Sequence, residues 1–287
     1  MFAKVCAAVL ALVALAACGT GESAPPTTSA VPLGPAVPAT SPVPAGVLDL
    51  PFDDYRLNFA EDAEIERART ILARACLRER GVRLDVPDDV RTPGVIDVEP
   101  NLRRYGVIDE VSATRYGYHF PRTAEETRQQ EARARWSASL TEDQRMALFG
   151  EGGCTEKADA ELTTFDDAFF IAASRESLRV SEKDARVVAA KAAWRTCMAE
   201  RGYDYADPNA AVSDPRWRLD EAAISAAEHD TALADVRCKT SSRLVETWHD
   251  VEVGVQQEKI AGDADRFAAL ANARDRRLAA ARRVLAG

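Results

Sequence analysis

The fold is decided by two short stretches with the same pattern, ARACLRERGV at residues 73–82 and WRTCMAERGY at residues 194–203. Each has helix-forming residues and a cysteine about one turn before a glycine. Six identical residues recur at a constant offset of 121 positions, with no gap. They are Arg74, Cys76, Glu79, Arg80, Gly81 and Pro87, matched by Arg195, Cys197, Glu200, Arg201, Gly202 and Pro208.

The repeat has the pattern of a helix C-terminus. Glycine adopts the left-handed conformation just after a helix, and the next residue folds back on the last turn. We therefore expect Val82 to pack on Leu77 and Tyr203 to pack on Met198. Duplication of one unit and coincidence between two similarly capped helices are both open, and we favour duplication.

The rest of the folded part also has helical patterning, which predicts an all-α fold with two similar halves, residues 51–175 and 176–287. Thr141 and Gln144 form a capping box, and Ser181 is expected to cap the helix that bears Cys197. We also expect helices ending at Gly81, Gly106, Gly117 and Gly150, one over 155–173, and a helical run after Pro215 that breaks at Gly254 or Gly262.

The N-terminus has the parts of a bacterial export signal, which we place at residues 1–17. Lys4 precedes an apolar stretch over 5–14, and LAAC follows at 15–18. This resembles a lipobox, which directs lipid to the thiol of Cys18 and cleavage before it. A secretory signal cut at another small residue is the alternative. Two or three acyl chains would anchor the chain stably on the extracytoplasmic face of the cell membrane, since each buried CH₂ contributes about 0.8 kcal/mol.

Residues 18–50 comprise the lipidated cysteine and a linker rich in proline and alanine. The linker has almost no charge and many prolines, so it cannot build a core. We expect a disordered, extended tether. At about 3 Å per residue it would hold the folded part about 50 to 90 Å from the bilayer.

The cysteines predict two disulfides. Cys6 would leave with the signal and Cys18 would carry lipid, so four cysteines remain in an exported chain. Four cysteines allow three pairings, and the repeat favours one bridge in each half. A zinc site is the alternative, although the spacing shows no C-x-x-C pair. The favoured pairs are Cys76 with Cys154 and Cys197 with Cys238, each contributing up to about 4 kcal/mol.

Charge and motifs exclude several classes of function. The chain carries 37 basic and 46 acidic residues, for a net charge of −9, so we expect no nucleic-acid partner. It has no G-x-S-x-G elbow, phosphate-binding glycine loop, H-E-x-x-H motif or acidic calcium loop. We therefore predict no catalytic residues, no metal site and no cofactor.

An aromatic cluster is the candidate binding patch. Tyr105, Tyr116 and Tyr118 are half of the six tyrosines, and His119 follows directly. Exposed rings could stack on a sugar ring or on a partner's side chain. Core packing between short helices is the alternative, and we favour it. The two interpretations differ in the exposure of the rings.

Three motifs recur in one known family: a helix with Trp194, Cys197 and Gly202, the spacing of Asp235 and Cys238, and RYG at 104–106 followed by YGYH at 116–119. With them the chain resembles a family of actinobacterial lipoproteins with secreted helical ectodomains and paired cysteines. An actinobacterial source also fits the bias to arginine and alanine, which is typical of a GC-rich genome. The likeness covers most of the chain after Pro51, but Ala73 stands where the second copy has tryptophan. It implies no activity.

We therefore expect a membrane-anchored lipoprotein that is a non-catalytic binding or accessory protein of the cell envelope. The expected partner is an envelope protein, such as a component of a transporter or of the wall machinery. One alternative is a cell-wall or envelope hydrolase, which a pocket with convergent carboxylates or His119 would favour. Another is a small-ligand-binding receptor with a cleft between the two halves.

Overall fold

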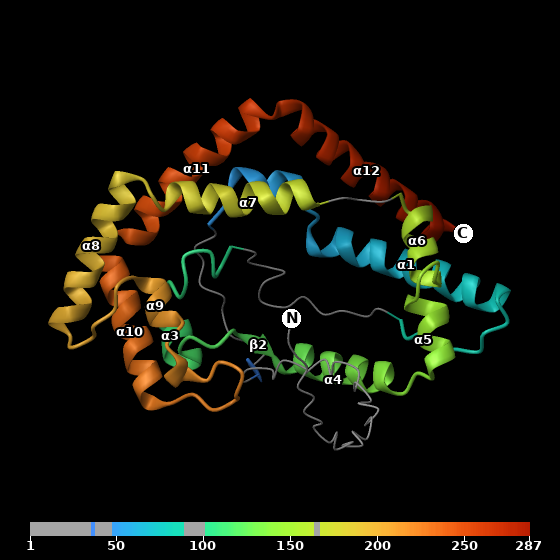
Figure 1. The fold of residues 1–287 in the computed structure, drawn as a ribbon, viewed down its shortest axis with the longest axis horizontal. Helices are drawn as coiled ribbons and strands as arrows, with labels where there is room; N and C mark the ends of the chain where they lie inside the picture. The colour runs from blue at the N-terminus through green and yellow to red at the C-terminus, as the bar shows by residue number, and fades with distance from the viewer. Residues whose placement is uncertain (1–35, 38–47, 89–100, 164–166) are drawn as a thin grey trace, which may run out of the picture. The chain divides into compact units, whose positions relative to one another are not determined.

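A computed structural model describes residues 36–37, 48–88, 101–163 and 167–287 of the chain (Figure 1). The fold is all-α, as predicted. The predicted signal at 1–17, the lipidation site Cys18 and nearly all of the linker at 18–50 lie outside the described residues. The strands in the described part are β1 (Ala36–Val37) and β2 (Arg122–Thr123), which pair in parallel.

Most of the described residues lie in helices, of which η1 and η2 are 3-10 helices and the others are α-helices. In chain order they are η1 (Pro51–Tyr55), α1 (Phe59–Glu79), α3 (Glu110–Tyr116), α4 (Ala124–Ala138), α5 (Glu142–Phe149), α6 (Cys154–Glu161), α7 (Ala168–Ser181), α8 (Ala185–Glu200), α9 (Pro208–Val212), η2 (Pro215–Trp217), α10 (Ala226–Ser241), α11 (Leu244–Gly262) and α12 (Ala264–Ala286).

The two repeated helix ends form the predicted caps. Gly81 after α1 has φ +69° and Gly202 after α8 has φ +85°, a conformation that glycine adopts readily. The Val82 N–H donates to the Leu77 carbonyl across 2.9 Å, and the Tyr203 N–H donates to the Met198 carbonyl across 3.0 Å. Val82 also packs against the hydrophobic cluster that contains Leu77, and Tyr203 packs against the one that contains Met198.

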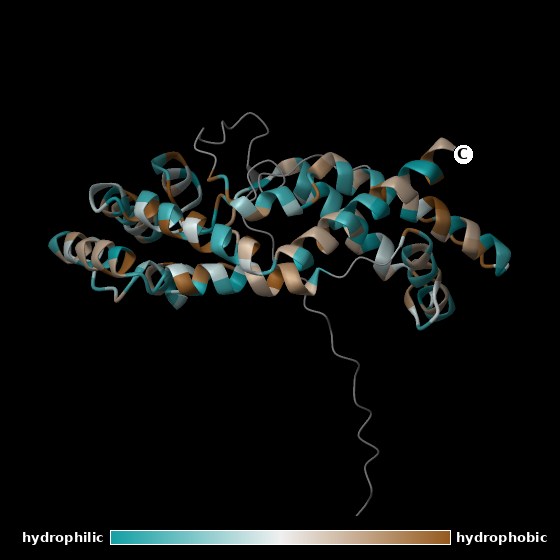
Figure 2. Ribbon diagram, turned by 90° about the horizontal axis from the view of Figure 1, so that it is seen from above, coloured by the Kyte–Doolittle hydropathy of each residue, from teal (hydrophilic) through white to brown (hydrophobic). Residues whose placement is uncertain are grey.

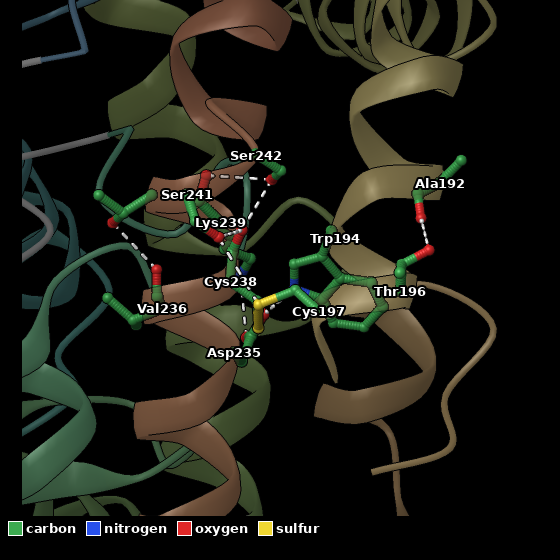
Figure 3. The surroundings of a disulfide bond; sticks show 11 residues. Ala192, Trp194, Thr196, Cys197, Asp235, Val236, Cys238, Lys239, Ser241 and Ser242 are labelled. Atoms are coloured by element: carbon green, nitrogen blue, oxygen red, sulfur yellow. Dashed lines mark hydrogen bonds and ion pairs between the residues drawn. A yellow bond between two sulfur atoms is a disulfide. The ribbon is translucent and has the colours of Figure 1, made fainter. Parts of the chain in front are cut away.

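The two disulfides confirm the predicted pairing. Cys76 at the end of α1 is bonded to Cys154 at the start of α6. Cys197 of α8 is bonded to Cys238 of α10, and Figure 3 shows this bridge between the two helices. Each bond joins a repeated helix end to another helix of the same predicted half.

The predicted halves are not separate structural units. The described residues lie within one compact unit, and the boundary that we expected between 175 and 176 falls inside α7. Helix α1 of the first half packs along α12 at the end of the second, and α7 packs along α11 (Figure 1). The largest hydrophobic cluster is built mainly from α8, α10, α11 and the segment around α3.

Several predicted elements differ in the structure. The helix expected over 155–173 is divided into α6 and α7, with Thr163 in the left-handed region at φ +70°. Asp184 caps α8, because its carboxylate accepts from the Arg186 N–H, whereas Ser181 ends α7. The segment before Gly106 is a turn instead of a short helix. The long C-terminal run breaks after Gly262, one of the two predicted positions.

Polar and apolar residues are interspersed along the helices, as the colours of Figure 2 show. Within the described residues, none of the helices combines the length and the apolar composition that crossing a membrane requires.

Candidate functional site

The predicted aromatic patch lies in the core. Tyr105, Tyr116 and Tyr118 are only 4%, 6% and 5% exposed, and His119 is 1% exposed. A recognition surface requires open ring faces, so the binding patch is wrong and the core interpretation is correct. The cluster does, however, contain buried polar groups that need partners, and one of those partners, Glu252, also binds the partly exposed Arg104.

Tyr105 follows Arg104 in the RYG motif and links to α11. Its hydroxyl donates to Glu252 across 2.8 Å, and its ring lies 5.2 Å from that of Trp248. Burial, followed by the negative charge of Glu252, raises the pKa of Tyr105 well above its usual range. The phenol therefore stays protonated and acts as a fixed donor.

His119 and Tyr118 both contact Glu228 of α10. The Tyr118 N–H donates to Glu228 across 2.8 Å, and the same carboxylate oxygen lies 2.8 Å from Nδ1 of His119. Nε2 of His119 lies 2.9 Å from the Glu221 carbonyl and donates to it, since that oxygen can only accept. This arrangement ties the YGYH segment to the start of α10.

Tyr118 and Tyr116 have hydroxyls without a hydrogen bond of ordinary geometry among the described residues. The Tyr118 ring lies 5.9 Å from that of Trp217. Burial, followed by the nearby charge of Asp235, raises the pKa of Tyr118 well above its usual range. Tyr116 is the last residue of α3 and is buried with the rest of the cluster.

A second buried network lies beside the Cys197–Cys238 bridge. Asp235 accepts from Nε1 of Trp194 across 2.8 Å and from Nζ of Lys239 across 2.9 Å (Figure 3). Lys239 also donates to the Val107 carbonyl across 2.8 Å. Desolvation lowers the pKa of Lys239 and raises that of Asp235. These groups are fully enclosed, so their role is to hold α8, α10 and the segment before α3 together.

Arg104 is partly exposed and binds the buried Glu252. Its Nε lies 3.2 Å from the buried carboxylate of Glu252, with which it forms an ion pair. Nη1 donates to the Ser174 hydroxyl across 3.0 Å, and Nη2 donates to the Ser174 carbonyl across 2.7 Å. Gln256 donates to the same Glu252 across 3.1 Å. Arg104 thereby fixes the RYG turn to both α7 and α11.

A pocket of about 370 Å³ opens beside this network, and we call it the arginine pocket. Its charged residues are three arginines and one aspartate, and its apolar wall includes two phenylalanines. It is lined by Leu50, Phe52, Asp53, Arg56, Asn101, Arg104, Phe170, Ile171, Ser174, Arg175 and Gln256.

Two other pockets differ in character. One of about 510 Å³ lies near the end of α8, and its Asp214 is already held by Arg216 and by the Tyr205 hydroxyl. Another of about 390 Å³ has Trp136 and Phe149 in its wall, with charges of both signs at its edge. No group of three or more histidine, cysteine, aspartate or glutamate residues in the described part is arranged to hold a metal ion.

The comparisons with known proteins add no relative. No family model, curated protein or solved structure matches this chain.

The RYG motif is visible in the sequence, but the partners of Arg104 are not. Arg104 and Glu252 are 148 positions apart, and a lone glutamate in a helix gives no local signal of a distant partner. The Asp235 and Lys239 pair has i, i+4 spacing, which usually marks an exposed helix face. The available signal was the position of Asp235 one turn before Cys238, which is fully buried.

Proposed function

We propose that this chain is a lipoprotein anchored to the extracytoplasmic face of a membrane through Cys18, and that it binds a ligand or partner in the cell envelope without catalysing a reaction. The actinobacterial lipoproteins that it resembles are the proposed family. The observation that carries the proposal is the pair of disulfides, because stable disulfides form in oxidising compartments outside the cytoplasm. The lipobox then supplies the means of anchoring.

Two further observations support a binding role. The folded part is held by two crosslinks and by buried polar networks, which suits a scaffold that presents a preformed site. The arginine pocket has an apolar wall and a few convergent polar groups, which are the usual features of a ligand site. This favours a small-ligand receptor as the second candidate function, beside an accessory protein with a protein partner.

The test of anchoring is metabolic labelling with an alkyne-tagged fatty acid in the native cell. We expect label on the wild-type chain and none on Cys18→Ala, because only this cysteine follows the lipobox. Cys6→Ala is the matched control, since this cysteine lies inside the predicted signal, and it should retain the label. Equal labelling of Cys18→Ala and wild type would refute the proposal.

A further inference from the structure

We infer that the arginine pocket binds a small organic anion, a carboxylate or phosphate ester that carries an apolar body. The inference extends the binding role proposed above to a class of ligand. Its first support is charge. Three arginines and a single aspartate line the pocket, although the whole chain carries a net charge of −9. Arg104 is paired with Glu252 and Arg56 with Asp53, so Arg175 supplies the positive charge that is not compensated. A locally positive concave surface on an acidic protein selects an anion over neutral and cationic competitors.

The second support is the set of hydrogen-bond donors. The guanidinium of Arg175, on the exposed side of α7, makes no hydrogen bond or ion pair with another described residue. Nη1 of Arg104 has one bond, to the Ser174 hydroxyl, and a second N–H of the same nitrogen remains. Guanidinium groups present paired donors whose geometry matches the oxygens of a carboxylate or phosphate.

The third support is that hydrogen bonds within the protein hold the inner residues of the pocket in place. Gln256 is 1% exposed, accepts from the Phe52 N–H across 2.9 Å and donates to Glu252. Asn101 donates to Asp53 across 2.7 Å and to the Leu48 carbonyl across 2.8 Å. These contacts fix the inner side chains, so binding requires little reorganisation.

The fourth support defines the rest of the ligand. Phe170 and Ile171 form the accessible part of an apolar wall, in front of the buried Leu50 and Phe52, and Ile171 is 39% exposed. A free inorganic ion would leave this wall in contact with water, whereas an alkyl or aromatic body would cover it. The volume of about 370 Å³ is at the small end of the range for ligand pockets.

The experiment measures binding of octanoate, octyl phosphate, octanamide and octylamine by calorimetry. The protein is the full chain with Cys18→Ala, so that no acyl chain competes for the apolar wall. We expect octanoate or octyl phosphate to bind at least about fivefold more tightly than octanamide, as a charge-assisted hydrogen bond predicts, and octylamine to bind weakest. The tighter of the two anions identifies the carboxylate or the phosphate as the preferred head group.

Two variants on the same helix provide the matched comparison. Arg175→Gln removes the free guanidinium of the pocket, and Arg179→Gln removes an equal charge that pairs with Glu176 outside it. Arg175→Gln should abolish the preference for the anion, whereas Arg179→Gln should retain it, with unchanged melting temperatures in both. Equal binding of octanoate and octanamide, absence of anion binding, or equal loss in both variants would overturn the inference. Fatty-acid labelling tests the anchor separately, so either proposal can fail alone.

Discussion

Lys239 and Asp235 form an ion pair inside the core, with 2.9 Å between Nζ and Oδ2 and side chains that are 1% and 0% exposed. The pair lies beside the Cys197–Cys238 bridge (Figure 3). A buried pair is costly to desolvate, and removing one member leaves the other charge without compensation.

Replacement of Lys239 by methionine should therefore be strongly destabilising. We expect Lys239→Met to lower the free energy of unfolding by about 3 to 5 kcal/mol, measured by urea denaturation. The double variant Asp235→Asn with Lys239→Met should be more stable than the single variant, because asparagine can still accept from Trp194 without a buried charge. A Lys239→Met protein as stable as wild type would contradict this account of the pair.

Truncation of the buried tyrosines should be a folding lesion. Tyr118→Ala and Tyr116→Ala should each lower the free energy of unfolding by about 3 to 5 kcal/mol, because both rings are enclosed in the core. Thermal unfolding of the two variants checks this. A melting temperature unchanged from wild type would restore the recognition interpretation of the cluster.

The same tyrosines predict a dependence of stability on alkaline pH. The folded pKa values of Tyr105 and Tyr118 are raised above the unfolded value of about 10, so folding favours the protonated phenols. Their contribution is complete below pH 10 and is lost as pH rises, by about 1.4 kcal/mol per pH unit for each tyrosine. In an ultraviolet titration of phenolate, these two should titrate only as the protein unfolds. Ionisation of all six tyrosines near pH 10 with the fold intact would exclude this.

Alanine substitutions at two glycines distinguish the cost of backbone strain from the cost of a steric clash. Gly117 has φ +52°, and a Cβ added there would lie 2.5 Å from Glu228. Gly202 has φ +85°, with nothing within 4 Å of an added Cβ. Gly202→Ala should cost about 1 to 2 kcal/mol for the left-handed conformation alone. Gly117→Ala should cost clearly more, because it also displaces Glu228 from His119. Equal losses in chemical denaturation would show that the Glu228 contact contributes nothing.

The features that sequence predicted are those with a local cause. The caps at Gly81 and Gly202 depend on a few adjacent residues, and so does the Thr141 capping box of α5. Helix α4 was missed although Thr123 and Glu126 form the same kind of box, because α4 has no buried residue in the described structure and so lacks apolar periodicity. Its signal was the capping box alone.

The features that sequence could not predict depend on distant partners. Arg104 contacts Ser174 and Glu252, 70 and 148 positions away, and its position decides where the arginine pocket opens. Ser181 has the residue type of an N-cap, but its hydroxyl accepts from Trp248 of α11, and Asp184 caps α8 instead. In both cases tertiary contacts decide between local structures that the neighbouring sequence allows equally well.

The central claim is that the folded part forms in an oxidising compartment with one bridge at each repeated helix end. The direct measurement is peptide mapping of the protein taken from its native cell, with free thiols blocked at lysis and no reduction before digestion. We predict that Cys76, Cys154, Cys197 and Cys238 escape the blocking reagent, and that peptides are crosslinked as Cys76 with Cys154 and Cys197 with Cys238. Blocked thiols at these positions, or a bridge between Cys76 and Cys197, would contradict it.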